Sequence, residues 1–588
     1  MAVENLITEH IDIWTSAVKT KSTSGRGSSK KLELYGVKKL RELILELAVR
    51  GKLVPQDPSD EPASVLLERI AEEKKRLVKD KLIPRTKGLP PINEDEIPID
   101  LPNGWTVVRL GELTSKLGSG STPRGGKNAY TSEGIPFLRS QNVRNEGIKL
   151  DDIAYISEEI HQKMENTKVL PGDVLLNITG ASLGRSTIFP SNLVEANVSQ
   201  HVTIIRLIES QMNQFIHLGI LSPLVQQLVW GRQVGMAIEG LSKKVLEMFE
   251  FPIPPIAEQH RIVAKVDELM ALCDQLEQQT ETSIEAHQVL VTTLLDTLTN
   301  SANADELIQN WARISEHFDT LFTTEESIDQ LKQTILQLAV MGKLVPQDPS
   351  DEPAAELLKR IAEEKTQLVK EKKIKKQKAL PPIAEDEKPF ELPNGWEWER
   401  IGTFGVVGTG ATPSRSNPKY WDDPKYNWVS SGETSELFVS TTKEKVSELA
   451  IQETNVSIYP SGTLIVAMYG QGKTRGQITE LTKPAGTNQA CAAIQLIEKN
   501  ESHKDFVKLY FRKSYEELRS NAAGGAQPNL NVGKVQSTVI AVPPLNEQQR
   551  INTKVNELLT VCDHLKAHFE AVQSTQLHLT DAIVEQAV

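Results

Sequence analysis

Apolar residues recur at helical spacing near the start of this 588-residue chain and again past its midpoint. The first set is Val37, Leu40, Ile44 and Leu47, and the second is Ile328, Leu331, Ile335 and Leu338. Steps of three and four place such residues on one face of a helix, so each set predicts an amphipathic helix. Both patterns stop at Gly-Lys-Leu-Val-Pro, where Gly and Pro favour the end of a helix.

Two longer patterns begin at Ile262 and Ile551, with a repeat that alternates steps of four and three. A 3.5-residue repeat over about four heptads predicts a coiled-coil seam. About 40 residues at 1.5 Å each would make a rod of roughly 60 Å. The alternative is an ordinary amphipathic surface helix. The predicted seams are Ile262, Val266, Leu269, Cys273, Leu276, Thr280, Ser283, His287, Leu290 and Leu294, and Ile551, Val555, Leu558, Cys562, Leu565, Phe569, Val572, Gln576, Leu579 and Ile583.

The chain is one unit of roughly 290 residues written twice. Residues 47–63 and 338–354 differ at one position, and the Pro-Pro-x-x-Glu-Gln sequence at 254–259 returns at 543–548. Charged helices and Pro-rich linkers repeat in the same order. We therefore expect five segments: an N-terminal helical region with its linker (1–102), a first block (103–255), a central helical region (256–393), a second block (394–544) and a C-terminal helix (545–588).

The two blocks have a different texture from the helical segments. Short β-like runs such as 173–178, 201–207, 463–468 and 491–496 alternate with turns rich in Gly, Ser and Asn. The blocks resemble each other much less than their flanks do. We expect an α+β fold, in which two pseudo-symmetric mixed α/β blocks are joined by long helices.

Composition places the chain among cytoplasmic proteins of ordinary type. Hydrophobic residues make up 39% and charged residues 24%, with a net charge of −12 carried mostly outside the two blocks. Three cysteines cannot form a disulfide framework, no apolar run has membrane-spanning length, and the N-terminus does not read as a secretory signal. We expect no membrane association. Residues 20–31 read as a basic linker, with a DNA-contacting arm as the alternative.

The sequence offers little for catalysis. His564 and His568 have the spacing of a zinc pair, but no Glu follows the first, so we expect no metal site. Cys273 and Cys562 fall in the predicted seams, where thiols act as small apolar groups. Residues 467–474 approach a phosphate-binding loop, but the first Gly is absent and no helix is predicted after it. We expect no cofactor bound by this chain.

The turns of both blocks carry side chains suited to base edges. Arg and Lys suit guanine, Asn and Gln suit adenine, and Ser and Thr suit either. The alternative for each residue is a solvated loop position. The candidate DNA-binding residues are Arg124, Lys127, Arg139, Gln141, Asn142, Arg144, Ser182, Arg185, Gln233 and Lys243 in the first block, and Arg415, Ser431, Glu433, Gln471, Lys473, Arg475, Gln527 and Asn529 in the second.

Taken together, these motifs make the chain similar to the specificity subunits of type I restriction-modification enzymes. The resemblance covers nearly all of the sequence and rests on several paired stretches. They are Gly-Lys-Leu-Val-Pro-Gln-Asp-Pro-Ser-Asp-Glu-Pro-Ala, Leu-Pro-Asn-Gly-Trp, the Thr-Pro turns at 122–123 and 412–413, the Pro-Gly-Asp-Val-Leu run at 171–175, and the Pro-Pro-x-x-Glu-Gln-x-Arg-Ile helix starts at 254–262 and 543–551.

This resemblance implies that the chain has no catalytic activity of its own. Each block would be a target recognition domain that reads one half of a split, asymmetric site in double-stranded DNA. The long helices would form an antiparallel coiled coil that sets the spacer. Partners would be two modification subunits, which bind S-adenosylmethionine and methylate adenine, and two restriction subunits, which use ATP and Mg²⁺.

Two departures and two alternatives accompany the resemblance. Pro460-Ser461-Gly462 stands where the first block has Pro171-Gly172-Asp173, and the first seam is polar at Thr280, Ser283 and His287. The next hypothesis is a coiled-coil scaffold with two ligand-binding domains and no role on DNA. A duplicated enzyme ranks third.

Overall fold

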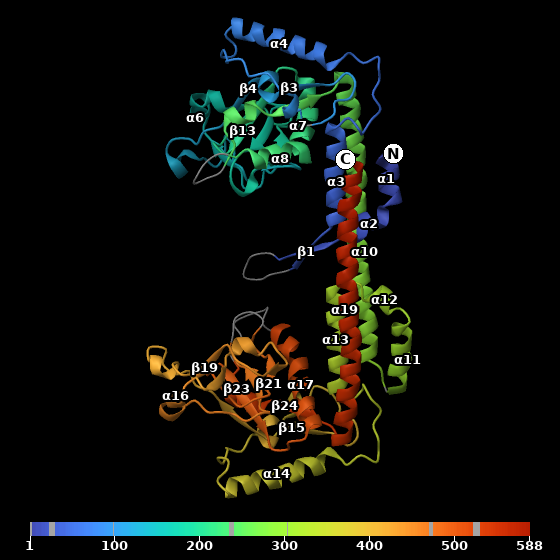
Figure 1. The fold of residues 1–588 in the computed structure, drawn as a ribbon, viewed down its shortest axis with the longest axis vertical. Coiled ribbons are helices and arrows are strands. Elements are labelled where there is room, and N and C mark those ends of the chain that lie inside the picture. The colour runs from blue at the N-terminus through green and yellow to red at the C-terminus, as the bar shows by residue number, and fades with distance from the viewer. Residues whose placement is uncertain are drawn as a thin grey trace. The chain divides into compact units, whose positions relative to one another are not determined.

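The computed structural model of the chain describes residues 3–22, 30–97, 99–233, 240–302, 304–469, 474–520 and 530–588. They belong to two compact units, one of residues 1–283 with 572–588 and one of residues 284–571. Each unit combines packed helices, which we call its stem, with a block of short strands (Figure 1). The region 256–393, expected from the sequence as one segment, is divided between the units after Ser283.

The stem of unit 1 consists of three helical segments that lie side by side (Figure 1). They are α3 (Tyr35–Val49), the first part of α10 (Ile256–Thr299) and the last part of α19 (Leu545–Ala587). Arg41 of α3 pairs with Asp274 at 2.6 Å and Glu277 at 2.7 Å on α10. The hydroxyl of Tyr35 donates to Asp581 of α19 at 2.7 Å. Both long helices are therefore tied to α3.

The stem of unit 2 repeats this arrangement with the other parts of the long helices. It contains α13 (Glu325–Val340), the first part of α19 and the last part of α10. Lys332 of α13 pairs with Asp563 of α19 at 2.8 Å, and Gln288 of α10 donates to Glu326 of α13 at 3.0 Å. Smaller helices accompany both stems: α1 (Val3–Glu9), α2 (Ile11–Ser16), α11 (Ala304–Ser315) and α12 (Phe318–Leu321).

The first half of each predicted seam lies on the buried face of its helix. Leu276 and Leu565 are half-buried, and the other members of this half are buried: Ile262, Val266, Leu269 and Cys273 in α10, and Ile551, Val555, Leu558 and Cys562 in α19.

Thr280 is also buried and Phe569 packs against the core, but beyond these two positions the predicted seams are wrong by one residue. Val291, Leu295 and Leu298 are buried where Leu290 and Leu294 were expected, and Leu290 is 49% exposed. In α19, Thr580 is buried while Leu579 is 45% exposed. The shift falls where each helix passes from one unit to the other, so its packing partner changes there. A straight helix of 3.6 residues per turn also drifts from a strict heptad, which favours such a step.

A joint made by the repeated motifs connects the block of unit 1 to its stem. The indole of Trp105 donates to Glu258 at 3.1 Å, and Gln56 donates to the same carboxylate at 3.3 Å. Arg261 pairs with Asp60 at 2.6 Å. Burial raises the pKa of Glu258, although these two donors act against the shift. The Glu-Gln-x-Arg sequence that opens α10 therefore holds the block and the preceding loop together.

Unit 2 has the same joint with nearly the same distances. Trp396 donates to Glu547 at 3.0 Å, and Gln347 donates to Glu547 at 3.1 Å. Arg550 pairs with Asp351 at 2.7 Å. The near-identity of the repeated stretches is thus explained by the need to build the same joint twice.

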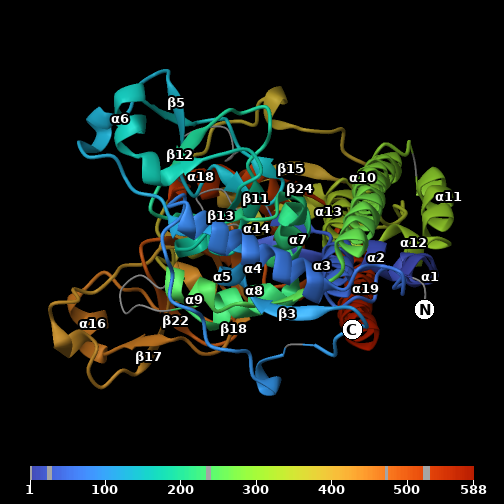
Figure 2. The same cartoon turned by 90° about the horizontal axis from the view of Figure 1, so that it is seen from above.

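The block of unit 1 contains two four-stranded sheets. The sheet on the stem side has the strand order β11-β10-β13-β4. The second sheet has the order β8-β5-β12-β9, and its strands β12 and β5 are parallel. The second sheet and α6 lie on the side of the block away from α3 and α10 (Figure 2). The bounds are β4 (Thr114–Ser119), β10 (Val174–Asn177), β11 (Ser186–Ile188), β13 (Val202–Leu207), β5 (Ile135–Leu138), β8 (Ala154–Ile156), β9 (Lys168–Val169), β12 (Ala196–Val198) and α6 (Glu158–Lys163).

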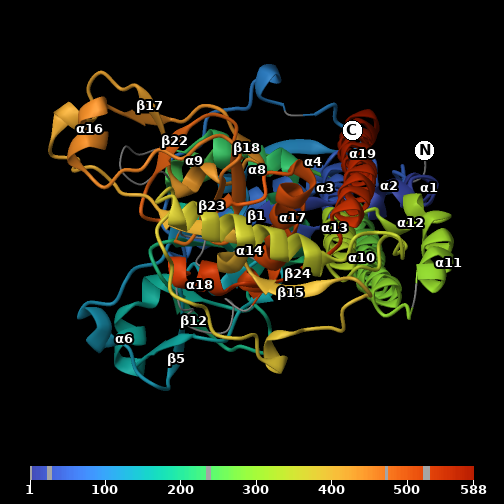
Figure 3. The ribbon, with the colours of Figure 1, turned by 90° about the horizontal axis from the view of Figure 1, so that it is seen from below.

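The block of unit 2 repeats the plan with a five-stranded sheet, β16-β23-β20-β21-β18, and a three-stranded sheet, β19-β17-β22. Strands β22 and β17 are again parallel, and their sheet and α16 lie away from α13 and α19 (Figure 3). The bounds are β16 (Gly405–Thr409), β18 (Phe438–Val439), β20 (Leu464–Ala467), β21 (Ile478–Leu481), β23 (Cys491–Leu496), β17 (Tyr426–Val429), β19 (Glu444–Val446), β22 (Ala485–Thr487) and α16 (Glu448–Glu453).

Short helices and two-stranded pairs complete each block. In unit 1 they include α4 (Ala63–Lys79), β3 (Thr106–Arg109), α5 (Leu110–Leu113), α7 (Asn213–Leu221), α8 (Pro223–Gly231), α9 (Lys243–Glu247) and β14 (Glu250–Ile253). In unit 2 they include α14 (Ala354–Lys370), β15 (Glu397–Arg400), α15 (Ile401–Phe404), α17 (Glu501–Ser520), α18 (Val532–Ser537) and β24 (Val539–Val542). The four β-like runs predicted from the sequence coincide with β10, β13, β20 and β23, so the mixed α/β expectation is confirmed.

Candidate nucleic-acid interface

Four loops of unit 1 meet at one end of its block, which we call the loop end. Three of these segments follow strands: residues 120–125 follow β4, residues 139–145 follow β5, and residues 178–185 follow β10. The fourth, residues 199–201, connects β12 to β13. The amide of Ser199 donates to the carbonyl of Leu138 at 2.8 Å, and the amide of Ile178 donates to that of His201 at 3.0 Å. Buried Asn177 adds a bond from its side-chain amide to the carbonyl of Ser140 at 2.8 Å.

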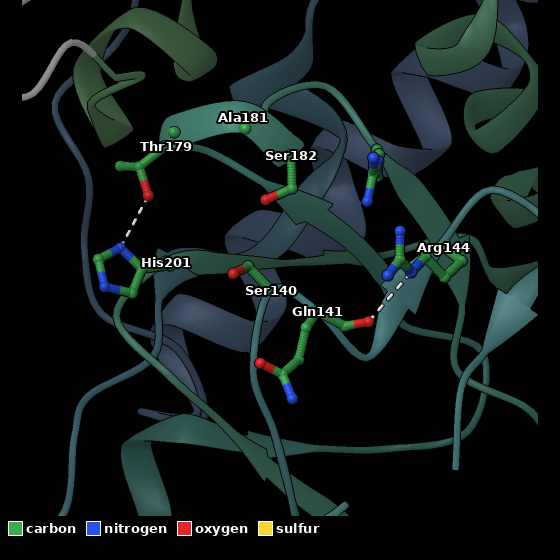
Figure 4. A pocket seen from close by; sticks show the side chains of 9 residues that line it. Ser140, Gln141, Arg144, Thr179, Ala181, Ser182 and His201 are labelled. Atoms are coloured by element: carbon green, nitrogen blue, oxygen red, sulfur yellow. Dashed lines mark hydrogen bonds between the residues drawn. The ribbon is translucent and has the colours of Figure 1, made fainter. Parts of the chain in front are cut away.

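A concave site of about 410 Å³ opens at this loop end (Figure 4). Its lining carries hydrogen-bond donors and no carboxylate. Four of its residues, Gln141, Arg144, Ser182 and Arg185, are among the candidates chosen from the sequence. Residue type did not single out the rest of the lining, of which the polar members are Ser140, Thr179 and His201.

Hydrogen bonds fix several of these side chains. Thr179 Oγ1 lies 2.7 Å from His201 Nδ1, and Arg144 Nε donates to the carbonyl of Gln141 at 3.1 Å (Figure 4). The amide nitrogen of Gln141 donates to Asp152 at 2.7 Å. The site is therefore organised before any ligand binds, with the remaining guanidinium donors of Arg144 still available.

The arginines of this block fall into two groups. Arg139, Arg206 and Arg232 contact Asp152, Asp173 and Glu250 respectively, and buried Arg109 contacts Glu250 and Glu96. Arg124, Arg144 and Arg185 make no ion pair with any residue that the structure describes. Arg124 and Arg185 lie in loops of the loop end, and Arg144 lies there in the two-residue strand β6 (Val143–Arg144). Positive charge without an internal counter-ion is thus concentrated there.

Asn142 serves the fold rather than the surface. It is 1% exposed, its carbonyl oxygen accepts from the amide of Arg139 at 3.0 Å, and its side-chain amide donates to the carbonyl of Lys149 at 3.0 Å. Glu433 has the same place in unit 2, where its carboxylate accepts from the amides of Ser430 at 2.8 Å and Lys443 at 2.9 Å. Asn142 holds the turn after β5, and Glu433 holds the turn after β17. Neither residue therefore belongs to the proposed DNA-reading surface.

Asn142→Ala should therefore lower the free energy of unfolding by about 1–3 kcal/mol, because it leaves buried backbone groups without partners. Gln141→Ala, next to it in the chain, should change this free energy by less than about 0.5 kcal/mol, since its side chain is exposed. Urea denaturation followed by circular dichroism would measure both. Equal effects of the two substitutions would contradict the assignment of Asn142 to the turn.

Other candidates of the first block lie elsewhere. Gln233 donates to the carbonyl of Trp230 at 3.0 Å, and Lys243 pairs with Glu247 at 3.3 Å within α9, so neither lines the site. Arg124 is exposed on the loop after β4. The side chain of Lys127 lies outside the described residues.

In the second block, Arg415 has internal partners. Both terminal nitrogens of its guanidinium donate to the carboxylate of Glu444, at 2.5 and 2.8 Å. The guanidinium carbon Cζ lies 3.9 Å from the ring centre of Trp421. The bond to Glu444 raises the pKa of Arg415 and lowers that of the carboxyl. Ser431 follows β17 as Ser140 follows β5, and Arg475 is half-buried in the loop after β20. Gln471, Lys473, Gln527 and Asn529 lie outside the described residues, as does part of the 20–31 segment.

Among the described residues, no group of three or more His, Cys, Asp or Glu is placed to hold a metal ion. Burial raises the pKa of Cys273 and Cys562 to about 11, so these thiols stay protonated at neutral pH. Within the described part of the chain, no helix has the length and apolar character to cross a membrane.

Comparison with known sequences decides the family. The domain described as "Type I restriction modification DNA specificity domain" matches twice, at residues 102–286 and 393–571. The chain belongs to the specificity subunits of type I restriction enzymes. It is 43% identical over 607 aligned residues to the EcoEI specificity subunit of Escherichia coli, and 41% identical over 616 to the EcoAI specificity subunit of the same organism. In both cases the alignment covers 100% of each chain.

A solved structure of a type I restriction-modification system gives a weaker likeness. It is 16% identical, covers 83% of this chain and 98% of its own, and has a TM-score of 0.49. The family assignment rests on the sequence matches. The specificity subunit described here thus carries one specificity domain in each unit, and each match takes in the block, the Trp–Glu bond of its joint and the first part of a long helix.

Proposed function

We propose that each block reads one half of a split, asymmetric site in double-stranded DNA. The observation that carries this proposal is the concave site of unit 1, whose Arg144, Arg185 and Gln141 present donors on ordered loops. Guanidinium groups match the O6 and N7 acceptors of guanine, and amides match adenine. The lack of a lining carboxylate favours a nucleic acid over a cationic ligand.

We further propose that α10 and α19 pair as an antiparallel coiled coil that fixes the spacer between the half-sites. The division of both helices supports this, because each begins in one unit and ends in the other. The repeated joints Trp105–Glu258 and Trp396–Glu547 support equivalent seating of the two blocks.

The partners we propose are two modification subunits and two restriction subunits, in the cytoplasm of a bacterial cell. The modification subunits would bind S-adenosylmethionine and methylate adenine, and the restriction subunits would use ATP and Mg²⁺. This chain would bind none of these cofactors. Its net charge of −12 supports dependence on partners, since a subunit that reads bases can take its phosphate affinity from them.

Co-expression with the cognate modification subunit, followed by methylome sequencing, tests this proposal. We expect methylated adenines within one split motif, with two defined halves and an unspecified spacer. A continuous motif, or no sequence-specific methylation by an assembled complex, would contradict it. The second outcome would favour a scaffold with no role on DNA.

A further inference from the structure

Each block contains an equivalent hairpin, formed by β10 and β11 in unit 1 and by β20 and β21 in unit 2. This hairpin places one residue of each unit at the same position. In unit 1, Leu176 of β10 is opposite Ser186 of β11, and in unit 2, Val466 of β20 is opposite Ile478 of β21. The residues just before β11 and β21 are Arg185 and Gln477. Equivalent backbone bonds close the two hairpins there, so Arg185 and Gln477 are structural counterparts.

Four hydrogen bonds define this equivalence. The carbonyl of Arg185 accepts from the amide of Asn177 at 2.8 Å, and that of Gln477 accepts from the amide of Ala467 at 2.9 Å. The preceding glycines, Gly184 and Gly476, donate back to Asn177 at 3.0 Å and to Ala467 at 2.8 Å. Both glycines have a positive φ, +84° and +85°, a conformation that side chains disfavour. The backbone that carries each counterpart residue is therefore held in a defined geometry.

The side chains at these positions differ in the chemistry that base recognition uses. Arg185 is half-buried in the lining of the concave site and makes no ion pair with a described residue. Gln477 is also half-buried, and its amide oxygen accepts from Thr434 Oγ1 at 3.4 Å, while its amide nitrogen has no hydrogen-bond partner among the described residues. A planar guanidinium matches guanine with two parallel bonds, and a carboxamide matches adenine in the same way.

We propose that Arg185 and Gln477 are equivalent specificity-determining residues, with Arg185 reading a guanine in one half-site and Gln477 an adenine in the other. This inference rests on the proposed function. Arg144, from the neighbouring loop, adds a second guanidinium to the unit 1 site, whereas Ser435 is at the matching place in the chain of unit 2. The half-site of unit 1 is therefore expected to be the richer in guanine contacts.

A phosphate contact for Arg185 is less consistent with its place. Arg124 is exposed on an outer loop of the same end and suits a phosphate, while Arg185 lies half-buried among the lining residues beside Ser182. The substitution Arg185→Lys separates the two roles. Lysine keeps the charge that a phosphate needs and can still donate to guanine, but it lacks the rigid fork of arginine and should therefore hold only part of the preference for guanine.

The experiment uses methylome sequencing of the assembled modification complex with the wild type, Arg185→Gln, Arg185→Lys and Gln477→Arg. We expect Arg185→Gln to lose about 10- to 100-fold of the preference for guanine at one position of one half-site, and Arg185→Lys to lose a smaller part of the same preference. Gln477→Arg should lose a similar preference for adenine at one position of the other half-site. Lys163→Gln, an exposed charge change on α6 that pairs only with Glu159, is the matched control and should leave the motif unchanged.

Each outcome decides between the alternatives. Uniformly weaker methylation with unchanged base preferences, or full retention of specificity by Arg185→Lys, would overturn the inference while leaving the split-site function intact. Loss of preference in both halves from one substitution would overturn it as well. A wild-type complex without a split motif would instead contradict the proposed function itself. Thermal denaturation of each variant confirms that any change in specificity comes from a folded complex.

Discussion

Val291→Asp should lower the free energy of unfolding of unit 2 by about 3–5 kcal/mol, whereas Leu290→Asp should lower it by less than about 1 kcal/mol. The two residues are neighbours on α10, so helix propensity and helix-dipole effects are closely matched. Val291 is 1% exposed in the core of unit 2, and Leu290 is 49% exposed. Asp at 291 would bury a carboxylate without a partner, while Asp at 290 would remain in water.

Urea denaturation followed by circular dichroism, with hydrogen exchange to locate the change in unit 2, would measure this difference. The opposite order of effects would restore the strict heptad seam that the sequence pattern suggested. Thr580 and Leu579 offer the same comparison on α19, where they are buried and 45% exposed respectively. The first-half residues Ile262 and Ile551 do not distinguish the two registers, because both registers bury them.

This register shift shows where periodicity predicts packing and where it does not. Apolar spacing identified the long helices and the buried positions from Ile262 to Leu276. The pattern failed beyond Thr280, because there α10 leaves the partners of unit 1 and meets α12 and α13, as the bond from His287 to the carbonyl of Leu321 illustrates. A change of partner is a tertiary event, and local spacing carries little information about it.

At the loop end, too, residue type predicted some members of the site, and only the contacts in the structure separated them from their neighbours. Residue type correctly selected Gln141, Arg144, Ser182 and Arg185 as members of one site. It could not separate them from Asn142, whose amide reaches the carbonyl of Lys149 across the turn. Thr179 and His201 were missed because each adjoins a strand-like run and neither stood out as a loop residue.

The sequence identifies the repeated motifs as an internal duplication, and the contacts explain their structural role. The Trp105–Glu258 bond and the Arg261–Asp60 pair recur as Trp396–Glu547 and Arg550–Asp351. Each joint connects the last residues of a Pro-rich linker, the loop after the first stem helix and the start of a long helix. Because the joints match, a block taken from one unit should seat correctly in the other.

A chain that carries residues 103–255 in both units should therefore recognise an inverted repeat. Replacing 394–544 by a second copy of 103–255 keeps the ends of the Leu-Pro-Asn-Gly-Trp and Pro-Pro sequences that form the joint. If α10 and α19 form the proposed antiparallel coiled coil, two identical readers should read the same half-sequence on opposite strands, as symmetric DNA-binding proteins do. We expect the half-site read by unit 2 to be replaced completely by the half-site read by unit 1, while the half-site read by unit 1 stays unaltered.

Methylome sequencing of this duplicated-block chain with its modification subunit is the most direct test of the central proposal, that each block reads one half-site and that an antiparallel coiled coil joins the two blocks. The account predicts a split palindrome in which the half read by unit 1 appears twice, inverted, around the spacer. A direct repeat of that half would contradict the proposed antiparallel coiled coil. An unchanged wild-type motif would contradict the assignment of one half-site to each block.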